Sequence, residues 1–358
     1  MLFIFRKNIN FPFHTAKLRF RPNFLILISI TLIFVSLFNS KRKLHKMQIK
    51  LKFALLLVAF SSLIFMACEK KIETNDVPPP FVGLDKPAAG KGFQVHIPPY
   101  MIPAQYEREI FVRMPIGNTE EVFVNEINSK MRPGTHHLVL REYLYKDEKY
   151  LPKIGQIREQ NLPNATTNYY SNLSGDKILF EALTPDFSYR LPDGFALKMP
   201  PNHTMDFNSH YFNKTDATRF GEIYCNFLTI PKEKVTQLVT PIEGDGNADL
   251  VLQPKERKTF IHNFPYEKKT TVLSLLSHTH KRGEKFVIKY YGGKRNGEVL
   301  YVSEYWEHPI YLNLPKPIVF EAGEGLTSEV TYYNESSRTI SFGVTSDDEM
   351  NFIFGFQY

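Results

Sequence analysis

Cysteine is nearly absent from this sequence of 358 residues, which contains only Cys68 and Cys225. Cys68 lies at the end of an apolar N-terminal stretch that has the layout of an export signal. If Cys68 is modified there, Cys225 has no partner and the folded part contains no internal disulfide. Cysteine usage therefore does not indicate a redox compartment, and the N-terminal stretch must do so instead.

Acidic residues are missing from the first 67 positions, where 11 Lys and Arg occur between Arg6 and Lys52. The whole chain carries a net charge of +7. Beyond position 67, however, 33 Lys and Arg stand against 37 Asp and Glu, which leaves about −4. The basic character thus belongs to the N-terminal leader, and the charge balance argues against nucleic acid as a partner of the folded part.

Long helical patterns are also missing, because no stretch beyond the leader combines a 3.6-residue apolar period with capping signals. Instead, short segments rich in β-branched and aromatic residues alternate with turn residues, as in "HHLVLREYLY", "KTTVLSLLSHTH", "KFVIKYYGG" and "NFIFGFQY". The 30 Phe and 19 Tyr suit sheets that pack face to face. The sequence predicts an all-β protein.

The stretch "VTPIEGDGNADLVLQPKERK", residues 239–258, loses apolar residues and gains Gly, Asp and Pro. Roughly 265 residues follow the leader and its tether, which is room for two domains of ordinary size. We therefore expect two tandem antiparallel β-sandwich domains of the jelly-roll kind, over residues 93–238 and 259–358. Residues 239–258 are expected to link them.

The leader reads "MQIKLKFALLLVAFSSLIFMAC" from Met47, which is a basic start, an apolar run, a small residue and Cys68. This arrangement resembles the lipobox of bacterial lipoproteins, although Phe65 stands where Leu is usual. The resemblance implies a signal region over residues 1–67 and lipidation of Cys68, and we expect the true start at Met47. Several acyl chains would hold the protein on a membrane of the bacterial cell envelope.

Residues 68–92 are charged and then rich in Pro and Gly, which is typical of a flexible tether. A second apolar run, Phe24 to Phe38, lies upstream of Met47. It is shorter than the roughly 20 residues that a membrane-spanning helix needs. A genuine spanning segment there remains the alternative to a mis-assigned start.

Histidines form three compact groups in the folded part, which lie in "RPGTHHLVL", "FNSHYFN" and "SHTH". In a strand, His278 and His280 point to the same face, whereas His136 and His137 point to opposite faces unless a β-bulge re-aims one of them. Imidazole suits copper, zinc, iron or nickel, and a thioether selects copper. The spacing of the histidines does not favour copper over zinc as the bound metal. Each side chain could also simply be part of the core.

A further candidate ligand is Met350 in "TSDDEM". The series "HHLVL", "HY", "SHTH" and "TSDDEM" resembles the copper type II, ascorbate-dependent monooxygenases, the family of peptidylglycine α-hydroxylating and dopamine β-monooxygenases. The resemblance covers about residues 105–358. It extends to the flanking text "FVRMPI", "EHPI" and "EAGEGLTSEVTYYNES".

The resemblance implies an enzyme with two copper ions, one on each β-sandwich, that face each other across a water-filled cleft. Ascorbate or another reductant would supply electrons, and a small-molecule substrate would be hydroxylated with O2. The electron-transfer copper would be bound by His136, His137 and His210. The catalytic copper would be bound by His278, His280 and Met350.

Three positions depart from the amidating members of the family, which hold the substrate carboxylate with Arg, Asn and Tyr. Here Leu276, Phe352 and Phe354 stand in their places, and they cannot grip a carboxylate as an Arg fork does. We expect an apolar or aromatic substrate in a pocket formed by these three, unless Lys281 or Arg282 supplies a charge. Peptide amidation is disfavoured.

Two other classes of function remain open. One is a copper-binding or copper-delivery lipoprotein without turnover, and the other is a surface binding module without metal. The complete set of five histidines and one methionine argues against the second, because a binding module has no need of it. The sequence does not indicate an oligomeric state.

Overall fold

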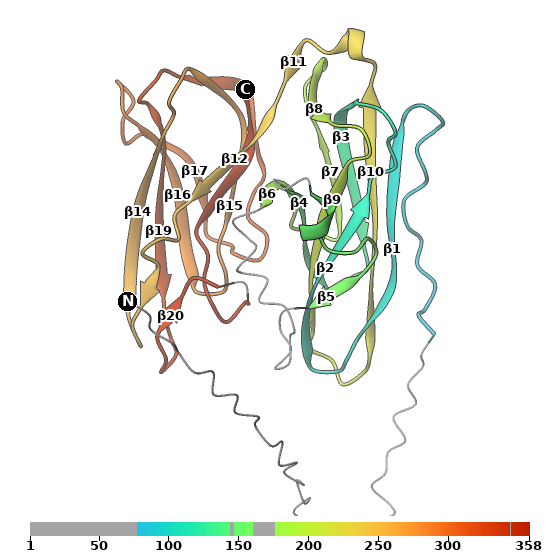
Figure 1. The fold of residues 1–358 in the computed structure, drawn as a ribbon. Helices are drawn as coiled ribbons and strands as arrows, with labels where there is room; N and C mark the ends of the chain where they lie inside the picture. Colours follow the sequence, from blue (N-terminus) through green and yellow to red (C-terminus); the bar gives the residue numbers. More distant parts are fainter. Residues whose placement is uncertain (1–76, 144–146, 160–175, 344) are drawn as a thin grey trace, which may run out of the picture. The chain divides into compact units, whose positions relative to one another are not determined.

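The computed structural model describes residues 77–143, 147–159, 176–343 and 345–358, which belong to one compact unit. Cys68, the leader before it and residues 69–76 of the expected tether lie outside the described residues. Within them the chain forms β-strands and two short 3-10 helices, Glu148–Tyr150 and Lys232–Lys234, and no α-helix (Figure 1). The prediction of an all-β protein is confirmed.

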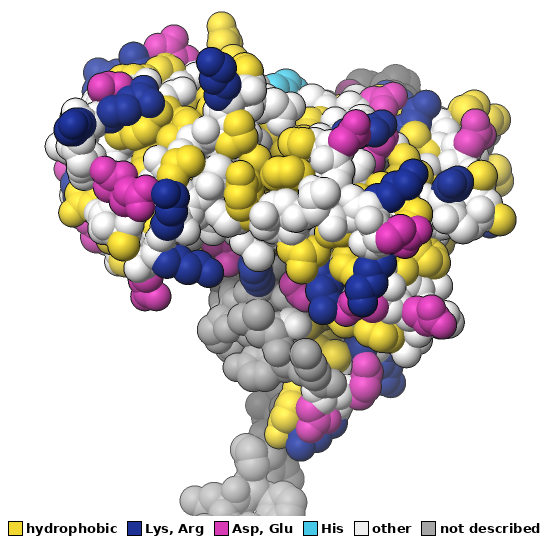
Figure 2. Space-filling view, turned by 90° about the horizontal axis from the view of Figure 1, so that it is seen from above, with side chains coloured by type: hydrophobic (Ala, Val, Ile, Leu, Met, Phe, Trp, Pro, Cys, Tyr) yellow, Lys and Arg dark blue, Asp and Glu magenta, His cyan; other side chains and the backbone are white. Residues whose placement is uncertain are grey.

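Among these residues, no helix is long and apolar enough to span a membrane. On the face of the molecule that Figure 2 shows, Lys and Arg side chains are interspersed with Asp and Glu side chains. Hydrophobic side chains are scattered between them. This face therefore has no broad patch of one sign.

The N-terminal half of the described chain contains two sheets, which share a hydrophobic core. Ile97, Ile127 and Phe227 of one sheet meet Leu138 and Phe207 of the other in that core, all 2% exposed or less. The first sheet has the order β1 (Gly92–Ile102), β10 (Arg219–Ile230), β3 (Val122–Met131), β8 (Phe195–Met199), β11 (Gln237–Leu238), with β7 (Asp186–Arg190) also on β3. The second has the order β5 (Ile157–Glu159), β2 (Tyr106–Pro115), β9 (Thr204–Asn213), β4 (Thr135–Tyr143), β6 (Asp176–Ala182).

The C-terminal half contains two four-stranded sheets around a second core, to which Leu275, Ile288, Val330 and Ile353 belong. One sheet has the order β12 (Thr240–Asp245), β21 (Phe352–Gln357), β15 (Thr270–His278), β18 (Leu312–Phe320). The other has the order β14 (Arg257–Pro265), β19 (Gly325–Tyr333), β16 (Gly283–Tyr291), β17 (Val299–Ser303). A two-stranded sheet pairs β13 (Val251–Leu252) with β20 (Ile340–Ser341).

The stretch expected as a linker, residues 239–258, differs from that expectation. It contains β12, β13 and the start of β14, and Ile242 on β12 is buried in the second core. Pro241 and Gly244 weaken the strand signal of this stretch. Both are tolerated because β12 is an edge strand that pairs only with β21.

The two halves contact each other, because Leu273 and Phe356 of the second half pack into the first core. The rings of Tyr189 and Phe356 are stacked with their centroids 5.0 Å apart. β7 of the first half and β21 of the second are thereby held near each other, which brings together side chains from both halves.

Candidate metal centre

The first group of histidines forms a compact cluster on adjacent strands. β4 carries His136 and His137, and β9 carries His210 directly opposite His137. One ligand atom from each side chain can be chosen so that all three lie within 4.8 Å of one another. All three side chains are buried, with exposed fractions of 7%, 4% and 1%. The structure thus brings together the three residues predicted for the first copper.

The neighbours His136 and His137 share this cluster because β4 is irregular at that point. The pairing of β4 with β9 shifts register between Thr135 and His137, which is the β-bulge that two adjacent histidines facing one site require. The preceding Gly134 has a φ of +97°, a conformation that suits glycine, and the Tyr211 ring fills the place of a side chain there. The bulge and the glycine turn together aim His136 at the cluster.

Hydrogen bonds and burial leave lone pairs inside the cluster. Nδ1 of His136 lies 3.0 Å from Nδ1 of His137. Nε2 of His210 lies 2.6 Å from a Glu107 carboxylate oxygen, whereas its Nδ1 is buried without a hydrogen-bond partner among the described residues. A neutral imidazole that donates from Nε2 keeps a lone pair on Nδ1. The Nδ1 of His210 is therefore available to a metal ion.

Protonation of the two β4 histidines is strongly disfavoured. Burial is the largest cause of the lowered pKa of His136 and His137, and neighbouring imidazoles add to it. Neutral imidazole is the form that binds metal ions. The unpartnered Nδ1 of His210 and the two neutral imidazoles of β4 fit a metal such as copper or zinc.

The second group surrounds a cavity of about 50 Å³. His278 at the end of β15 and His280 two residues later both line it, with ring centroids 5.3 Å apart, as does Met350. Nδ1 of His280 lies 3.3 Å from the backbone oxygen of Asp348. If Nδ1 donates to that oxygen, Nε2 of His280 carries the lone pair.

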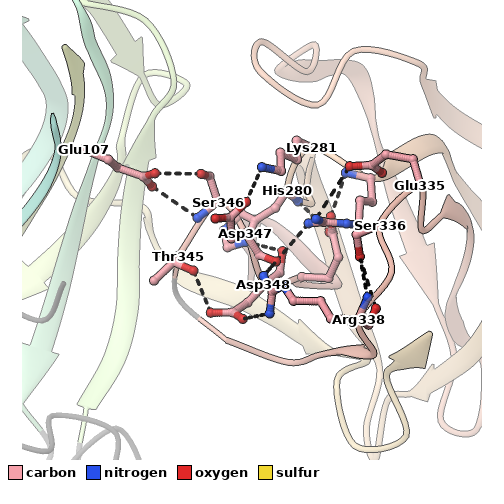
Figure 3. A network of polar contacts seen from close by, with 12 residues as sticks. Glu107, His280, Lys281, Glu335, Ser336, Arg338, Thr345, Ser346, Asp347 and Asp348 are labelled. Atoms are coloured by element: carbon pink, nitrogen blue, oxygen red, sulfur yellow. Dashed lines mark hydrogen bonds and ion pairs between the residues drawn. The ribbon is translucent and has the colours of Figure 1, made fainter. Parts of the chain in front are cut away.

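Met350 is positioned by a loop that is fastened to both halves of the chain (Figure 3). Ser346 donates from its hydroxyl to one Glu107 oxygen at 2.9 Å and from its backbone N–H to the other at 3.2 Å. Glu349 accepts from the backbone N–H groups of His280 at 2.9 Å and Arg282 at 2.7 Å. Burial raises the pKa of Glu349 to about 7. The loop thus connects Glu107, the partner of His210, with the residues around Met350.

The two histidine groups adjoin each other. The rings of His137 and His278 meet edge-on with centroids 5.9 Å apart, and His137 lines the same cavity as His278 and His280. The resemblance implied a water-filled cleft between two metal positions, and the structure differs from this. The contacts between the halves reduce that space to the cavity of about 50 Å³, and the five histidines form one continuous cluster.

Two buried carboxylates in this cavity were missed by the sequence analysis. Glu109 and Glu181 are each 3% exposed, and each has one oxygen without a hydrogen-bond partner among the described residues. Glu109 lies opposite His210 in the pairing of β2 with β9. Its position two residues after Glu107, on the same face of the strand and directly before the apolar run "IFV", was a signal that could have revealed it.

Glu181 comes from β6 and approaches the second histidine group. Its Oε1 lies 3.0 Å from Nδ1 of His278, which is an ion-pair distance but outside hydrogen-bond geometry. Burial opposes a charge on His278, but the carboxylates of Glu181, Glu349 and Glu109 together outweigh it and raise the pKa of His278. Nothing in the sequence around "FEALT" signals this contact, because it joins residues nearly one hundred positions apart.

The predicted substrate pocket is present in part. Phe352 and Phe354 line the cavity beside His278, whereas Leu276 packs against Phe354 in a small separate cluster. Lys281 and Arg282 bond to Asp347 and do not line this cavity.

The cation that does line the cavity is Arg141. Arg141 lies four residues after His137 on β4, and Val139, which lies between them, also lines the cavity. Alternation along the strand could have revealed this, because positions 137, 139 and 141 share one face. Arg141 is close enough to Glu109 to affect its pKa, which burial raises.

Comparison with known proteins identifies no family. No family model matches the chain, and no curated protein matches it. Among solved structures, one described as "Crystal Structure of the STIV MCP" is 9% identical, with a TM-score of 0.32 over 75% of this chain and 97% of that chain. Another, "Structure of infectious bursal disease virus Gx strain", is 12% identical, with a TM-score of 0.13 over 79% and 74%. Similarities this weak carry no argument about function.

Proposed function

We propose that the protein is a copper-dependent monooxygenase that hydroxylates an activated C–H bond with O2 and a reductant such as ascorbate. One observation supports this above the others. The side chains named from the sequence, which are spread from position 136 to position 350, gather around one cluster and its cavity. Their order and types are those of the copper monooxygenases that the sequence resembles.

Two copper ions would be bound by different donors. His136, His137 and His210 offer three nitrogens, with Glu107 fixing the orientation of His210. The other ion would take nitrogens of His278 and His280 and the Met350 thioether, a soft donor that supports Cu(I). Copper bound there would supply one-electron redox chemistry and reactivity toward O2.

The cavity favours a substrate with an apolar or aromatic part beside the reacting bond. Phe352 and Phe354 supply aromatic surface next to His278. Arg141 and Glu109 place both signs of charge in the same cavity, so a polar end of the substrate could also be held. The Arg position of the amidating relatives is Leu276, which supports a substrate other than a peptidylglycine.

The finer architecture and the location belong to the same proposal. Two pairs of packed sheets support two tandem jelly-roll-like β-sandwiches, one for each histidine group. The lipobox-like sequence before Cys68 supports a lipid anchor in the bacterial cell envelope.

A copper-binding or copper-delivery protein without turnover is the second candidate. It is favoured by the size of the cavity, because about 50 Å³ holds one or two small molecules such as water or O2 and not a whole organic substrate. A metal-free binding module is disfavoured, since it would leave the buried Nδ1 of His210 without any partner.

Copper analysis combined with O2 uptake tests the proposal. The purified protein should bind two copper ions per chain, and His210→Ala should lose about one of them. His96→Ala, a partly exposed histidine bonded to Glu222, should keep both. Reductant-dependent O2 uptake with a hydroxylated product supports the enzyme, whereas two coppers without uptake support delivery. A protein that binds no copper would contradict both candidates.

A further inference from the structure

A second, larger cavity lies against the first histidine group. This cleft has a volume of about 290 Å³, near the lower limit for ligand pockets of roughly 300 Å³. Residues of both halves line it, among them Tyr106, Lys214 and Phe212 of the first half and Lys281 and Trp306 of the second. It is defined here as the Trp306 cleft.

The Trp306 cleft reaches His136 and His210 through single side chains. The Trp306 ring lies 5.4 Å from the His136 ring, and the Phe212 ring lies 5.2 Å from His136 and 4.5 Å from His210. Glu107, which lines the cleft, is bonded to His210. The smaller cavity is instead lined by His137 and the second group. Two cavities therefore approach different members of one histidine cluster.

We propose that the Trp306 cleft binds the electron donor, a small, planar, hydroxyl-rich reductant of the enediol class, of which ascorbate is an example. This inference rests on the proposed function, because it assigns a place to the reductant which that function requires. The smaller cavity is then left to O2 and the reacting part of the substrate. Reductant and O2 enter at separate places, which keeps them from reacting with each other directly.

The side chains of the cleft match this class of ligand. Trp306 offers an aromatic surface for a planar ring. Tyr106 and Phe212 also line the cleft and add aromatic surface. Lys214 can donate to an enediolate oxygen.

Most charged side chains of the cleft already have partners, either within the cleft or beside it. Two of its carboxylates have partners, since Glu107 bonds to His210 and Ser346 and Asp347 bonds to Lys281. Lys214 and Glu307 remain, which makes the cleft close to neutral. A molecule with many hydroxyl groups and at most one charge fits this balance better than a polyanion such as a nucleotide.

The redox step balances with such a donor. Each reductant molecule would give one electron to a metal ion bound by His136, His137 and His210, would release a proton to solvent and would leave as a radical. Two molecules supply the two electrons that one hydroxylation consumes. One oxygen atom of O2 enters the substrate, and the other forms water with two protons.

Fluorescence of Trp306 provides a direct test, because it is the only tryptophan in the chain. Ascorbate is added without oxygen to the metal-free full-length protein, with free tryptophan as the reference for collisional quenching. The expected result is a saturable change in emission. Lys214→Ala should weaken binding about tenfold, which is the loss expected for a hydrogen bond to a charged group. Lys232→Ala, at an exposed position outside the cleft, should bind as the unaltered protein does.

Two outcomes would overturn the inference. One is the absence of any saturable change in emission, and the other is a saturable change that Lys214→Ala leaves unaltered. The proposed function is tested separately by copper content and O2 uptake. A protein that turns over with copper and ascorbate but shows no binding at Trp306 would contradict only the cleft assignment. Binding at Trp306 by a protein that takes up no copper would contradict the enzyme and the electron-donor role of the cleft, and would leave only a ligand site.

Discussion

Replacing Glu107 tests whether the first histidine group is a metal site. Glu107→Ala removes the acceptor 2.6 Å from Nε2 of His210, and with it both contacts to Ser346. The imidazole of His210 then loses the partner that fixes its orientation and tautomer. Loss of such a partner typically weakens metal binding about 10–100-fold. We expect Glu107→Ala to lower copper affinity at this site.

The structure indicates where in that range the effect should lie. The bond is short, and the His210 ring is 1% exposed, which both favour a large effect. The Glu107 side chain is 29% exposed, so water can partly replace it in the variant. We therefore expect a loss of about 10–30-fold, which corresponds to about 1.4–2 kcal/mol. The loop before Met350 loses its contact with Glu107, so affinity at the second site should fall as well, but less.

Competition with a coloured chelator measures both affinities, and thermal unfolding shows whether each variant is folded. Glu107→Gln keeps an oxygen acceptor and should recover most of the affinity. Glu126→Ala on β3, in the sheet that does not carry the histidines, should bind copper normally. Unaltered copper affinity in a well-folded Glu107→Ala protein would refute the assignment of His210 as a ligand oriented by Glu107.

Three further predictions follow from other parts of the chain. Met350→Ile conserves volume and should cost under about 1.5 kcal/mol of stability, while Cu(I) binding at the second site and hydroxylation are greatly reduced; full turnover would exclude a thioether ligand. Burial raises the pKa of the Cys225 thiol, which is 0% exposed, so alkylation at pH 8 should occur only after unfolding, and rapid labelling of the native protein would contradict this. Cys68→Ser should release the protein from membranes or leave it unprocessed, and normal membrane retention would argue against the lipid anchor.

The sequence alone predicted the all-β class, because alternation and β-branched residues report directly on strands. It also placed His278 and His280 on one face of a strand, and both line one cavity. It could not decide whether His136 and His137 share a face. That depends on a β-bulge, which is set by the pairing of β4 with β9 and not by local composition.

The contacts between the halves could not be predicted in the same way. The approach of Glu181 to His278 and the edge-on contact of His137 with His278 join residues far apart in the sequence. No spacing rule relates them, since they arise from how two cores pack together. β12 was missed because Pro241 and Gly244 resemble a linker, although an edge strand tolerates both.

The place of β21 has a consequence for how the chain matures during synthesis. β21, residues 352–357, lies between β12 and β15 in its sheet, yet it follows both in chain order by many residues. While the ribosome is still producing the chain, β12 and β15 lack the strand that joins them, although the sheets of the first half can already close. The full donor set cannot form until β21 inserts, because Met350 directly precedes it. A nascent or truncated chain could therefore hold metal through the first three histidines but could not assemble the cavity in which Met350 takes part.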